Sequence, residues 1–453
     1  MINLESQPQR SHSEFSAKFE TDSKYKILVG AVGLYSVAVY CTMAVMSIGA
    51  AICFLVFVAT GWGELKVELG AYKKTPLVLP TLALAVACFG SLIWAHFSGL
   101  EFLGVKPQVD LLRDNAKLWH LGFPFILAAL IQKIKNSDVI RILSLWMAFA
   151  FISAVFGIVQ HFVPLISPME IPNLAGRYHA TGLSGFHLSF ASILSFPMSV
   201  ALVMVAVSSK RLGFSKSTLA SVFVALVIVT ASMLTFSRTA WVATPLTVLL
   251  ICVIGFKGWP RRILIAFILG GSLFWIASQD FKLRFQNLES GSGRDRIELW
   301  EANWELLKAH PILGVGWHHN SDLSQVYFNE AAKRPGISGF KYRFSSHAHN
   351  NWIDQISSTG IVGFLAFFWF CSAIITMAYR LYYRVSAGDH ERGFYRTVGL
   401  GFLAGWFCFH INGMTQSNFW DAKVLHQVGW VSAITLELYR RVLEVDARKM
   451  SAL

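Results

Sequence analysis

Long apolar runs recur along the chain and restrict the kinds of fold that it can adopt. A helix needs about 20 mostly apolar residues to cross a bilayer. The runs therefore predict an all-α polytopic membrane protein with about 12 transmembrane helices. Two stretches, 27–60 and 218–256, are continuous and are divided only by length. The approximate spans are 27–43, 46–60, 75–97, 117–133, 139–163, 187–207, 218–237, 238–256, 261–278, 360–378, 397–413 and 425–439.

The composition agrees with this class and excludes an ordinary soluble protein. Of the 453 residues, 54% are hydrophobic and only 14% are charged. The 15 tryptophans suit the aromatic belts found at membrane interfaces. All six cysteines fall within apolar runs, so we expect neither a disulfide framework nor a cysteine metal site. The polar N-terminal stretch lacks the pattern of a signal peptide.

The formal net charge of +13 is explained by membrane topology rather than by nucleic-acid binding. With the N-terminus in the cytoplasm, 24 of the 39 Lys and Arg residues fall on the cytoplasmic side and six in short outer loops. The other nine lie in one long loop, where charge says little about topology. Because Lys and Arg favour the cytoplasmic side, we expect both termini there and the long loop outside.

These predictions divide the chain into five parts, of which the long loop is the most unusual. A loop of this length inside a compact protein is usually functional or disordered, and its composition favours a folded, functional segment. The parts are a cytoplasmic tail (1–26), transmembrane helices 1–9 (27–278), a periplasmic loop with an amphipathic helix (279–351), transmembrane helices 10–12 (352–439) and a second cytoplasmic tail (440–453).

Two arginines stand out because the positive-inside preference does not explain them. Arg177 precedes the span that begins at residue 187, and Arg238 falls at the turn between two apolar runs. An arginine at the edge of the hydrocarbon is costly unless it is paired or faces a wet cavity. Arg238 is therefore either a snorkelling anchor or part of a polar pocket, and its neighbours Ser237 and Thr239 favour the pocket.

The long loop contains an amphipathic pattern that predicts a helix over 296–309. Its apolar positions recur at helical spacing, Pro311 ends it, and it is expected to lie on the membrane surface or to cap a cavity. Arg294 and Arg296 stand at its N-terminal end, where the helix dipole also favours an anion. The alternative is a solvated helix start. The predicted apolar face consists of Ile297, Trp300, Trp304 and Leu307.

The loop ends in His347-Ala348-His349-Asn350-Asn351, which places two histidines two residues apart. With His318 and His319 they could form a zinc site, but no outer cysteine and no metal-binding helix motif supports this. His349 fits better as a general base or a diphosphate contact, with a locally hydrogen-bonded histidine as the alternative. An unperturbed histidine titrates near pH 6.5, so activity is expected to fall between pH 8 and 5.

Together these residues suit an anionic headgroup that is attached to a lipid. Guanidinium groups bind phosphates bidentately and stay charged at every relevant pH. Arginines can also stabilise a departing diphosphate without a metal ion. The histidine would then take the proton of an incoming hydroxyl.

Four blocks of the sequence resemble the bacterial O-antigen ligase/polymerase superfamily of integral membrane glycosyltransferases. The third block carries an Arg-xxx-Trp pair followed by His-Pro-xx-Gly-xx-Trp, and the fourth carries His-Asn followed by Gly-Ile-Val-Gly. After Arg177, where the family usually shows an Asn-Pro or Pro-Asn dipeptide, this chain has Gly185-Phe186-His187. The blocks are GRYHATGLSGFHLSFA (176–191), LTFSRTAWVA (234–243), GRDRIELWEANWELLKAHPILGVGW (293–317) and HAHNNWIDQISSTGIVGFLAF (347–367).

The resemblance implies a GT-C-like helical fold in the bacterial inner membrane, with its active site at the periplasmic face. The donor would be a glycan on undecaprenyl diphosphate, transferred with inversion and without metal or cofactor. His349, Arg296 and Arg238 would be catalytic. Donor-binding positions would be Arg177, Arg294, His347, Trp300 and Asn350.

The same motifs serve several activities. We expect an O-antigen ligase, which uses a sugar hydroxyl of lipid A-core as acceptor. The alternatives are an O-antigen or exopolysaccharide polymerase, whose acceptor is a second lipid-linked repeat unit, and a protein O-oligosaccharyltransferase. A lipid-linked glycan flippase belongs to a different class and predicts internal repeats with functional residues near the bilayer midplane. The candidate residues instead cluster on one face.

Overall fold

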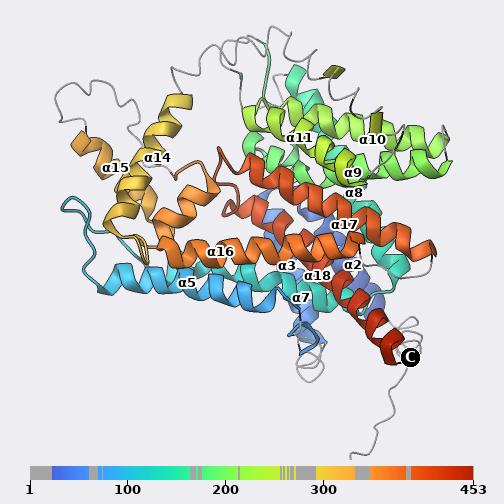
Figure 1. Cartoon of the computed structure of the whole chain (residues 1–453), viewed down its shortest axis with the longest axis horizontal. Coiled ribbons are helices and arrows are strands. Elements are labelled where there is room, and N and C mark those ends of the chain that lie inside the picture. The colour runs from blue at the N-terminus through green and yellow to red at the C-terminus, as the bar shows by residue number, and fades with distance from the viewer. Residues whose placement is uncertain are drawn as a thin grey trace, which may run out of the picture.

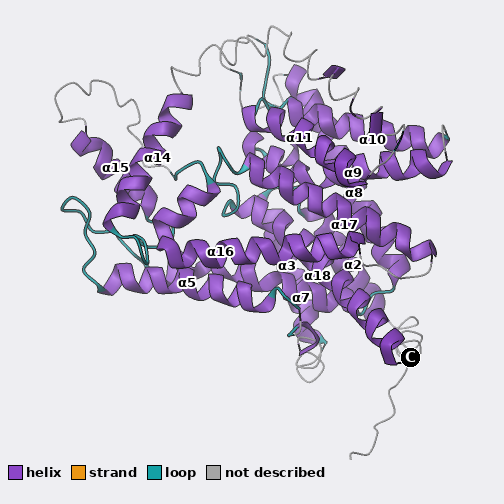
Figure 2. Ribbon diagram, viewed as in Figure 1, coloured by secondary structure: helices purple, strands orange, loops and turns teal. Residues whose placement is uncertain are grey.

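A computed structural model of the chain describes nearly all of its apolar runs. It covers residues 23–60, 70–73, 75–163, 170–171, 176–212, 215–255, 258, 261–262, 265, 270–271, 292–331, 347–383 and 389–451. Figure 2 shows that helices dominate this part of the chain. Across these residues β-structure is limited to two isolated bridges, Phe102 with Val105 and Glu170 with Tyr178. The all-α prediction is therefore confirmed.

The helices follow the predicted apolar runs closely, and the two continuous runs divide into pairs. The first run breaks between α2 and α3, and the second breaks between α10 and α11. The helices are α2 (Ser23–Ala38), α3 (Met43–Ala59), α5 (Val78–Phe97), α6 (Leu111–Asn115), η1 (Ala116–Leu118), α7 (Trp119–Gln132), α8 (Asn136–Phe162), η3 (Gly182–Ser184), α9 (His187–Leu212), α10 (Lys216–Met233), α11 (Arg238–Gly255), α14 (Ser292–Ala309), α15 (Asn320–Ala331), α16 (Asn351–Tyr383), α17 (Asp389–Asn412) and α18 (Ala422–Ser451).

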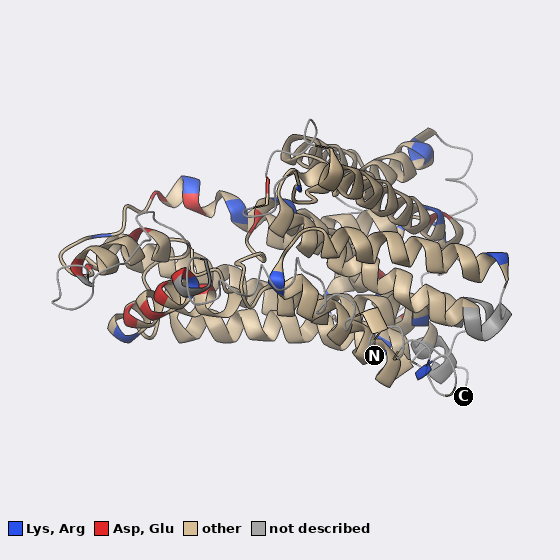
Figure 3. Cartoon of the chain, turned by 90° about the horizontal axis from the view of Figure 1, so that it is seen from above, with Lys and Arg blue, Asp and Glu red and all other residues tan. Residues whose placement is uncertain are grey.

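Six of the described helices, α5, α8, α9, α10, α11 and α16, are long and apolar enough to cross a membrane, and α3 is a shorter apolar helix. Figure 3 shows most charged positions near the two ends of the bundle, with few along its middle. A bilayer requires this distribution, because a charge at its centre is costly. The predicted total of about 12 spans stays a prediction, and most of the expected span 261–278 lies outside the described residues.

The helix bundle is elongated, and α14 and α15 lie at one end of it (Figure 1). We call this the α14 end, and the last turns of α18 lie at the opposite end. Helices α9 and α17 pack closely because small residues face the contact. A Cβ at Gly401 would lie 2.6 Å from Val200, and one at Gly405 would lie 2.7 Å from Phe196. These two helices form the centre of the bundle.

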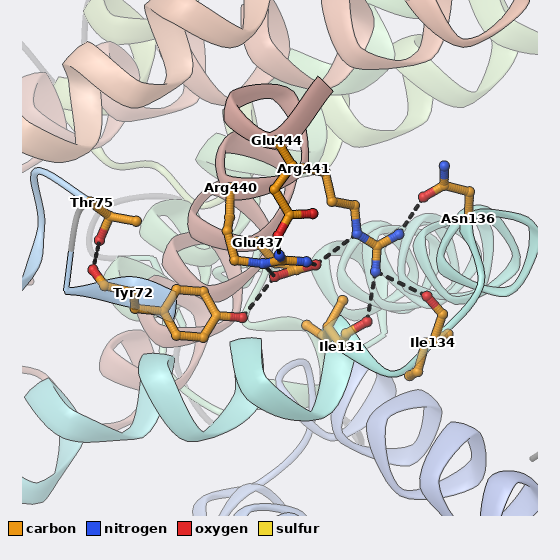
Figure 4. A network of polar contacts seen from close by, with 9 residues as sticks. All are labelled: Tyr72, Thr75, Ile131, Ile134, Asn136, Glu437, Arg440, Arg441 and Glu444. Carbon is orange, nitrogen blue, oxygen red and sulfur yellow. Dashed lines mark hydrogen bonds and ion pairs between the residues drawn. The ribbon is translucent and has the colours of Figure 1, made fainter. Parts of the chain in front are cut away.

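A buried ionic network holds α18 in place toward the opposite end (Figure 4). The carboxylate of Glu437 is fully buried and accepts hydrogen bonds from Arg440 (2.7 and 2.8 Å), Arg441 (2.7 Å) and the Tyr72 hydroxyl (2.7 Å). A buried charge is tolerated only with such partners. Arg441 also donates to the carbonyl oxygen of Ile131 (2.8 Å) in the last turn of α7, where backbone acceptors lack helical partners.

A kink at Gly360 joins α16 to the segment that follows α14. Gly360 has φ 65° and ψ −168°, a conformation essentially restricted to glycine. The kink lets Ile361 donate from its amide to the carbonyl of Pro311 (2.9 Å), while Gly316 donates to the carbonyl of Ser358 (3.0 Å). The first turns of α16 are thereby bonded to the backbone of 311–316.

We predict that Gly360→Ala destabilises this junction strongly. The new Cβ would come 2.2 Å from the carbonyl oxygen of Ile312, in addition to a backbone cost of about 1–3 kcal/mol. The measurement is the thermal unfolding midpoint of the purified protein in detergent. Gly90→Ala on α5 is the matched control, because its Cβ meets no atom within 4 Å. Equal midpoints for the two variants would contradict the packing described here.

Candidate active site

Helix α14 confirms the helix predicted over 296–309 and begins a few residues earlier, at Ser292. Its contact with the protein is made by Leu299, Ala302 and Leu306, which are fully buried. Two residues of the predicted apolar face, Ile297 and Trp304, are instead 63% and 58% exposed. The helix therefore has two apolar sides, and the sequence analysis identified the outer one.

A buried polar network fixes α14 relative to α15 and α16. The Asn320 side chain donates to Asn303 Oδ1 (2.8 Å) on α14 and to Asp354 Oδ1 (2.9 Å) on α16. Asp354 also accepts the backbone N–H of Ala348 (3.1 Å). Because Ala348 lies between the two histidines of the fourth block, one carboxylate sets the position of both the α14 helix and the histidine segment.

Trp300 and Asn350, two of the predicted substrate contacts, make hydrogen bonds that position the histidine segment. The indole N–H of Trp300 donates to the carbonyl oxygen of Ala348 (2.9 Å). The side-chain oxygen of Asn350 accepts the backbone N–H groups of Trp352 (2.9 Å) and Ile353 (3.2 Å) and so caps α16. Contact of either residue with a substrate stays a prediction.

His349 is held in a strained and well-defined position. Its φ is 49°, in the left-handed region that non-glycine residues rarely adopt. Its Nδ1 lies 2.9 Å from the side-chain oxygen of Gln416. An amide oxygen only accepts, so Nδ1 carries the proton and Nε2 is unprotonated. That tautomer is the one required of a base acting through Nε2.

The surroundings of His349 keep its imidazole neutral. Burial, and then the neighbouring His347 and the charge of Arg296, lower the pKa of His349 from its usual value to about 4, although the hydrogen bond that it donates to Gln416 opposes this shift. The rings of His347 and His349 are 4.2 Å apart. Arg296, at the N-terminal end of α14, makes the smallest of these contributions.

Arg238 is the first residue of α11 and is half-buried. It follows Phe236, another non-glycine residue in the left-handed region, at φ 54°. The next residue, Thr239, shares a hydrogen bond with the hydroxyl of Thr415 (3.0 Å). Since Thr415 precedes Gln416, the turn that carries Arg238 and the ring of His349 are attached to adjacent residues of one loop.

That loop, residues 413–421 between α17 and α18, is the part of the site that sequence reasoning missed. It also receives a hydrogen bond from Asn351 to Asn418 Oδ1 (2.6 Å) and returns one from the amide of Phe419 to Asn351 (3.0 Å). A signal was present in the polar run Thr-Gln-Ser-Asn (415–418), which lies between two predicted spans. We call residues 413–421 the hub loop.

Arg177 lies in a neighbouring loop and is exposed. Its guanidinium carbon is 4.9 Å from the centroid of the Phe162 ring. Two residues later His179 bonds to the carbonyl oxygen of Thr235 (2.8 Å), in the turn that leads to Arg238. The structure thus brings the loop of Arg177 beside the turn of Arg238, and gives no direct contact between Arg177 and His349.

Arg294 and His319 are two further residues that the sequence singles out. The side chain of Arg294 lies outside the described residues, although its backbone belongs to the first turn of α14. His319 is bonded through its two ring nitrogens to Asp114 (2.9 Å) and Asp322 (3.3 Å). Over the described ranges, no cluster of three or more His, Cys, Asp and Glu residues is arranged to hold a metal ion.

Helices of spanning length, with a neutral histidine and the turn of Arg238 joined to one connecting loop, are the features of a multi-pass membrane protein with a polar site at its helix ends. Residues 223–368 match the family model described as O-Antigen ligase. This match supports the resemblance to the O-antigen ligase/polymerase superfamily that the motifs predict. No curated protein shows significant similarity to the chain.

The matched region covers about a third of the chain and contains the main elements of the site. It runs from α10 to the first half of α16 and includes Arg238, Arg296 and His349. The hub loop and Arg177 fall outside it. The match therefore supports an enzymatic function for the chain.

Proposed function

We propose that the protein is an O-antigen ligase that transfers a glycan from undecaprenyl diphosphate to a sugar hydroxyl of lipid A-core. The observation that carries the proposal is the neutral His349, with Nε2 unprotonated, attached to the same loop as the turn of Arg238. A base next to fixed cations suits the attack of a hydroxyl on a carbon that bears an anionic leaving group.

In the proposed reaction, His349 Nε2 takes the proton of the acceptor hydroxyl as its oxygen bonds to the anomeric carbon. The bond from that carbon to the diphosphate oxygen breaks on the opposite side, so the configuration inverts. Arg238 and Arg296 bind the diphosphate and stabilise the charge it gains. Arg177 and Arg294 are the additional cations that the donor would meet, and the arginines take the role that a metal has in other diphosphate chemistry.

The proposed location is the inner membrane, with the site at the periplasmic face. The distribution of Lys and Arg supports this orientation, because the shortest predicted outer loops carry few of them. The histidine segment, the start of α11 and the hub loop are helix-end elements. A site at helix ends suits a donor whose headgroup lies at the membrane surface while its lipid remains in the bilayer.

The pH dependence of activity should follow His349. In substrate-free enzyme its pKa is about 4, so kcat/KM should stay level from pH 8 to about 5 and fall around pH 4, where the base becomes protonated. This replaces the decline between pH 8 and 5 that an unperturbed histidine predicts. Arg296 lowers this pKa, so Arg296→Gln should move the midpoint of the remaining activity upward. An unchanged midpoint would show that the charge of Arg296 does not act on His349.

Deletion of the gene tests which acceptor the enzyme uses. Loss of a ligase leaves core-only lipopolysaccharide and accumulated full-length lipid-linked polymer. Loss of a polymerase instead leaves core with a single repeat unit, and loss of a protein glycosyltransferase leaves lipopolysaccharide unchanged. A flippase mutant would retain transfer activity in solubilised membranes. Only the first outcome agrees with the proposal.

A further inference from the structure

His318 shares the features that mark His349, although it has no role in the mechanism above. In the described part of the chain, the non-glycine residues with positive φ are Leu103, Phe236, His318 and His349. Of these, Phe236 lies two residues before Arg238, and His349 is the proposed base. His318 has φ 68°, and strained backbone of this kind persists only where the surroundings enforce it, often at functional positions.

The surroundings of His318 place it at the other end of the hub loop from Arg238. Its ring centroid is 4.5 Å from that of Trp317 and 5.9 Å from that of Trp420. Trp420 is itself fixed by a hydrogen bond from its indole N–H to Gln355 (2.8 Å). Along the hub loop, Thr415 therefore meets the turn of Arg238, Gln416 meets His349, and Trp420 meets His318.

The Nε2 atom of His318 is buried and has no hydrogen-bond partner. A buried polar atom without a partner costs free energy, and such atoms are uncommon in folded proteins. Burial, and then the positive neighbour Lys117 and the rings of His319 and His347, lower the pKa of His318 well below its usual value. The ring is therefore neutral, and its free nitrogen can pair with a hydroxyl. Lys117 is exposed and follows Asp114 by three residues, and the carboxylate of Asp114 bonds to His319 (2.9 Å), the neighbour of His318.

We propose that His318 and Lys117 form an acceptor subsite, in which His318 Nε2 bonds to a sugar hydroxyl and Lys117 binds an anionic substituent of the same glycan. This inference rests on the proposed function. Inversion requires the acceptor to approach the anomeric carbon from the side opposite the diphosphate. His318 contacts Trp420 of the hub loop, whose Gln416 bonds to His349 and whose Thr415 bonds to the turn of Arg238, so all three groups border one loop.

The test measures donor and acceptor kinetics of the full chain in lipid nanodiscs, with a purified undecaprenyl-diphosphate glycan and a lipid A-core acceptor. His318→Ala should raise the acceptor KM by about 3- to 10-fold, the loss of one neutral hydrogen bond, and leave the donor KM unchanged. Lys117→Gln should raise the acceptor KM in the same direction, and more at low than at high salt.

His318→Gly separates binding from backbone strain. Glycine adopts φ 68° without cost, so this variant should fold at least as well as His318→Ala, yet its acceptor KM should be raised equally. Leu103→Ala is the control for a strained residue outside the site, and it should leave both KM values unchanged. A glycine variant with wild-type acceptor KM, or equal changes in donor and acceptor KM, would overturn the subsite. A wild-type enzyme that transfers no glycan to this acceptor would overturn the proposed function itself.

Discussion

Replacing His349 with alanine should reduce glycan transfer by about 100- to 10,000-fold, the range over which a positioned general base contributes. The loss should appear in kcat, because the hydroxyl proton moves only in the transition state. The measurement is the initial rate of transfer in nanodiscs at saturating donor and acceptor. His96→Ala, a change at an exposed histidine of α5, is the matched control and should leave the rate unchanged.

The hydrogen bond between His349 and Gln416 allows a second test of the proposed base. Gln416 fixes the proton on Nδ1 through a 2.9 Å hydrogen bond, so Gln416→Leu should also lower kcat while leaving His349 in place. Gln416→Glu would set a carboxylate beside the imidazole and raise its pKa. That variant should retain activity at neutral pH but lose it at a higher pH than the wild type does. Full activity of His349→Ala would show that another group takes the proton.

Replacing Arg238 with alanine should reduce kcat by about 100- to 1,000-fold, which is the usual effect of removing one donor from a developing anion. Arg238→Lys should recover little, since lysine keeps the charge but lacks the planar pair of donors that matches a diphosphate. The donor KM should rise and the acceptor KM should not. Arg141→Ala is the matched control, because Arg141 is 81% exposed in a surface pair with Asp138.

The arginines should also act as a unit. If Arg238 and Arg296 bind the same diphosphate, the double alanine variant should lose less than the product of the two single losses, because one lost contact already misplaces the donor. If the two losses are strictly multiplicative, the two arginines do not bind the same diphosphate. Wild-type kinetics for Arg238→Ala would support the alternative of an anchor at the membrane edge.

Much of the site could be predicted because local sequence patterns carry its chemistry. The helix over 296–309 follows from its spacing and from Pro311, and α14 confirms it. The second continuous apolar run divides where α11 begins, at Arg238, as length predicts, whereas the first divides a few residues before the predicted position, between Ala38 and Met43. Arginines and histidines that are unusual in an apolar chain were recognisable one by one, without knowledge of their neighbours.

Other features could not be predicted because they depend on residues far apart in the chain. The face of α14 that contacts the bundle was not identified, because Leu299, Ala302 and Leu306 are apolar residues like those on its outer side. The strained φ of His318 and His349 also leaves no mark in the residue types. The contact face of α14 and the backbone conformation of the two histidines both depend on packing between segments that are far apart in the sequence.

The sequence by itself determined the class of protein, its helices, the family that it resembles and the candidate cations and base, because length, hydropathy and residue type are local properties. Only the tertiary structure decided how these residues meet. It brought Gln416 to His349, 67 positions away in the chain, and buried the imidazole so that its pKa fell from its usual value to about 4. A pKa depends on the charges and solvent around a group, and these exist only once the hub loop has joined α11, α16 and the histidine segment.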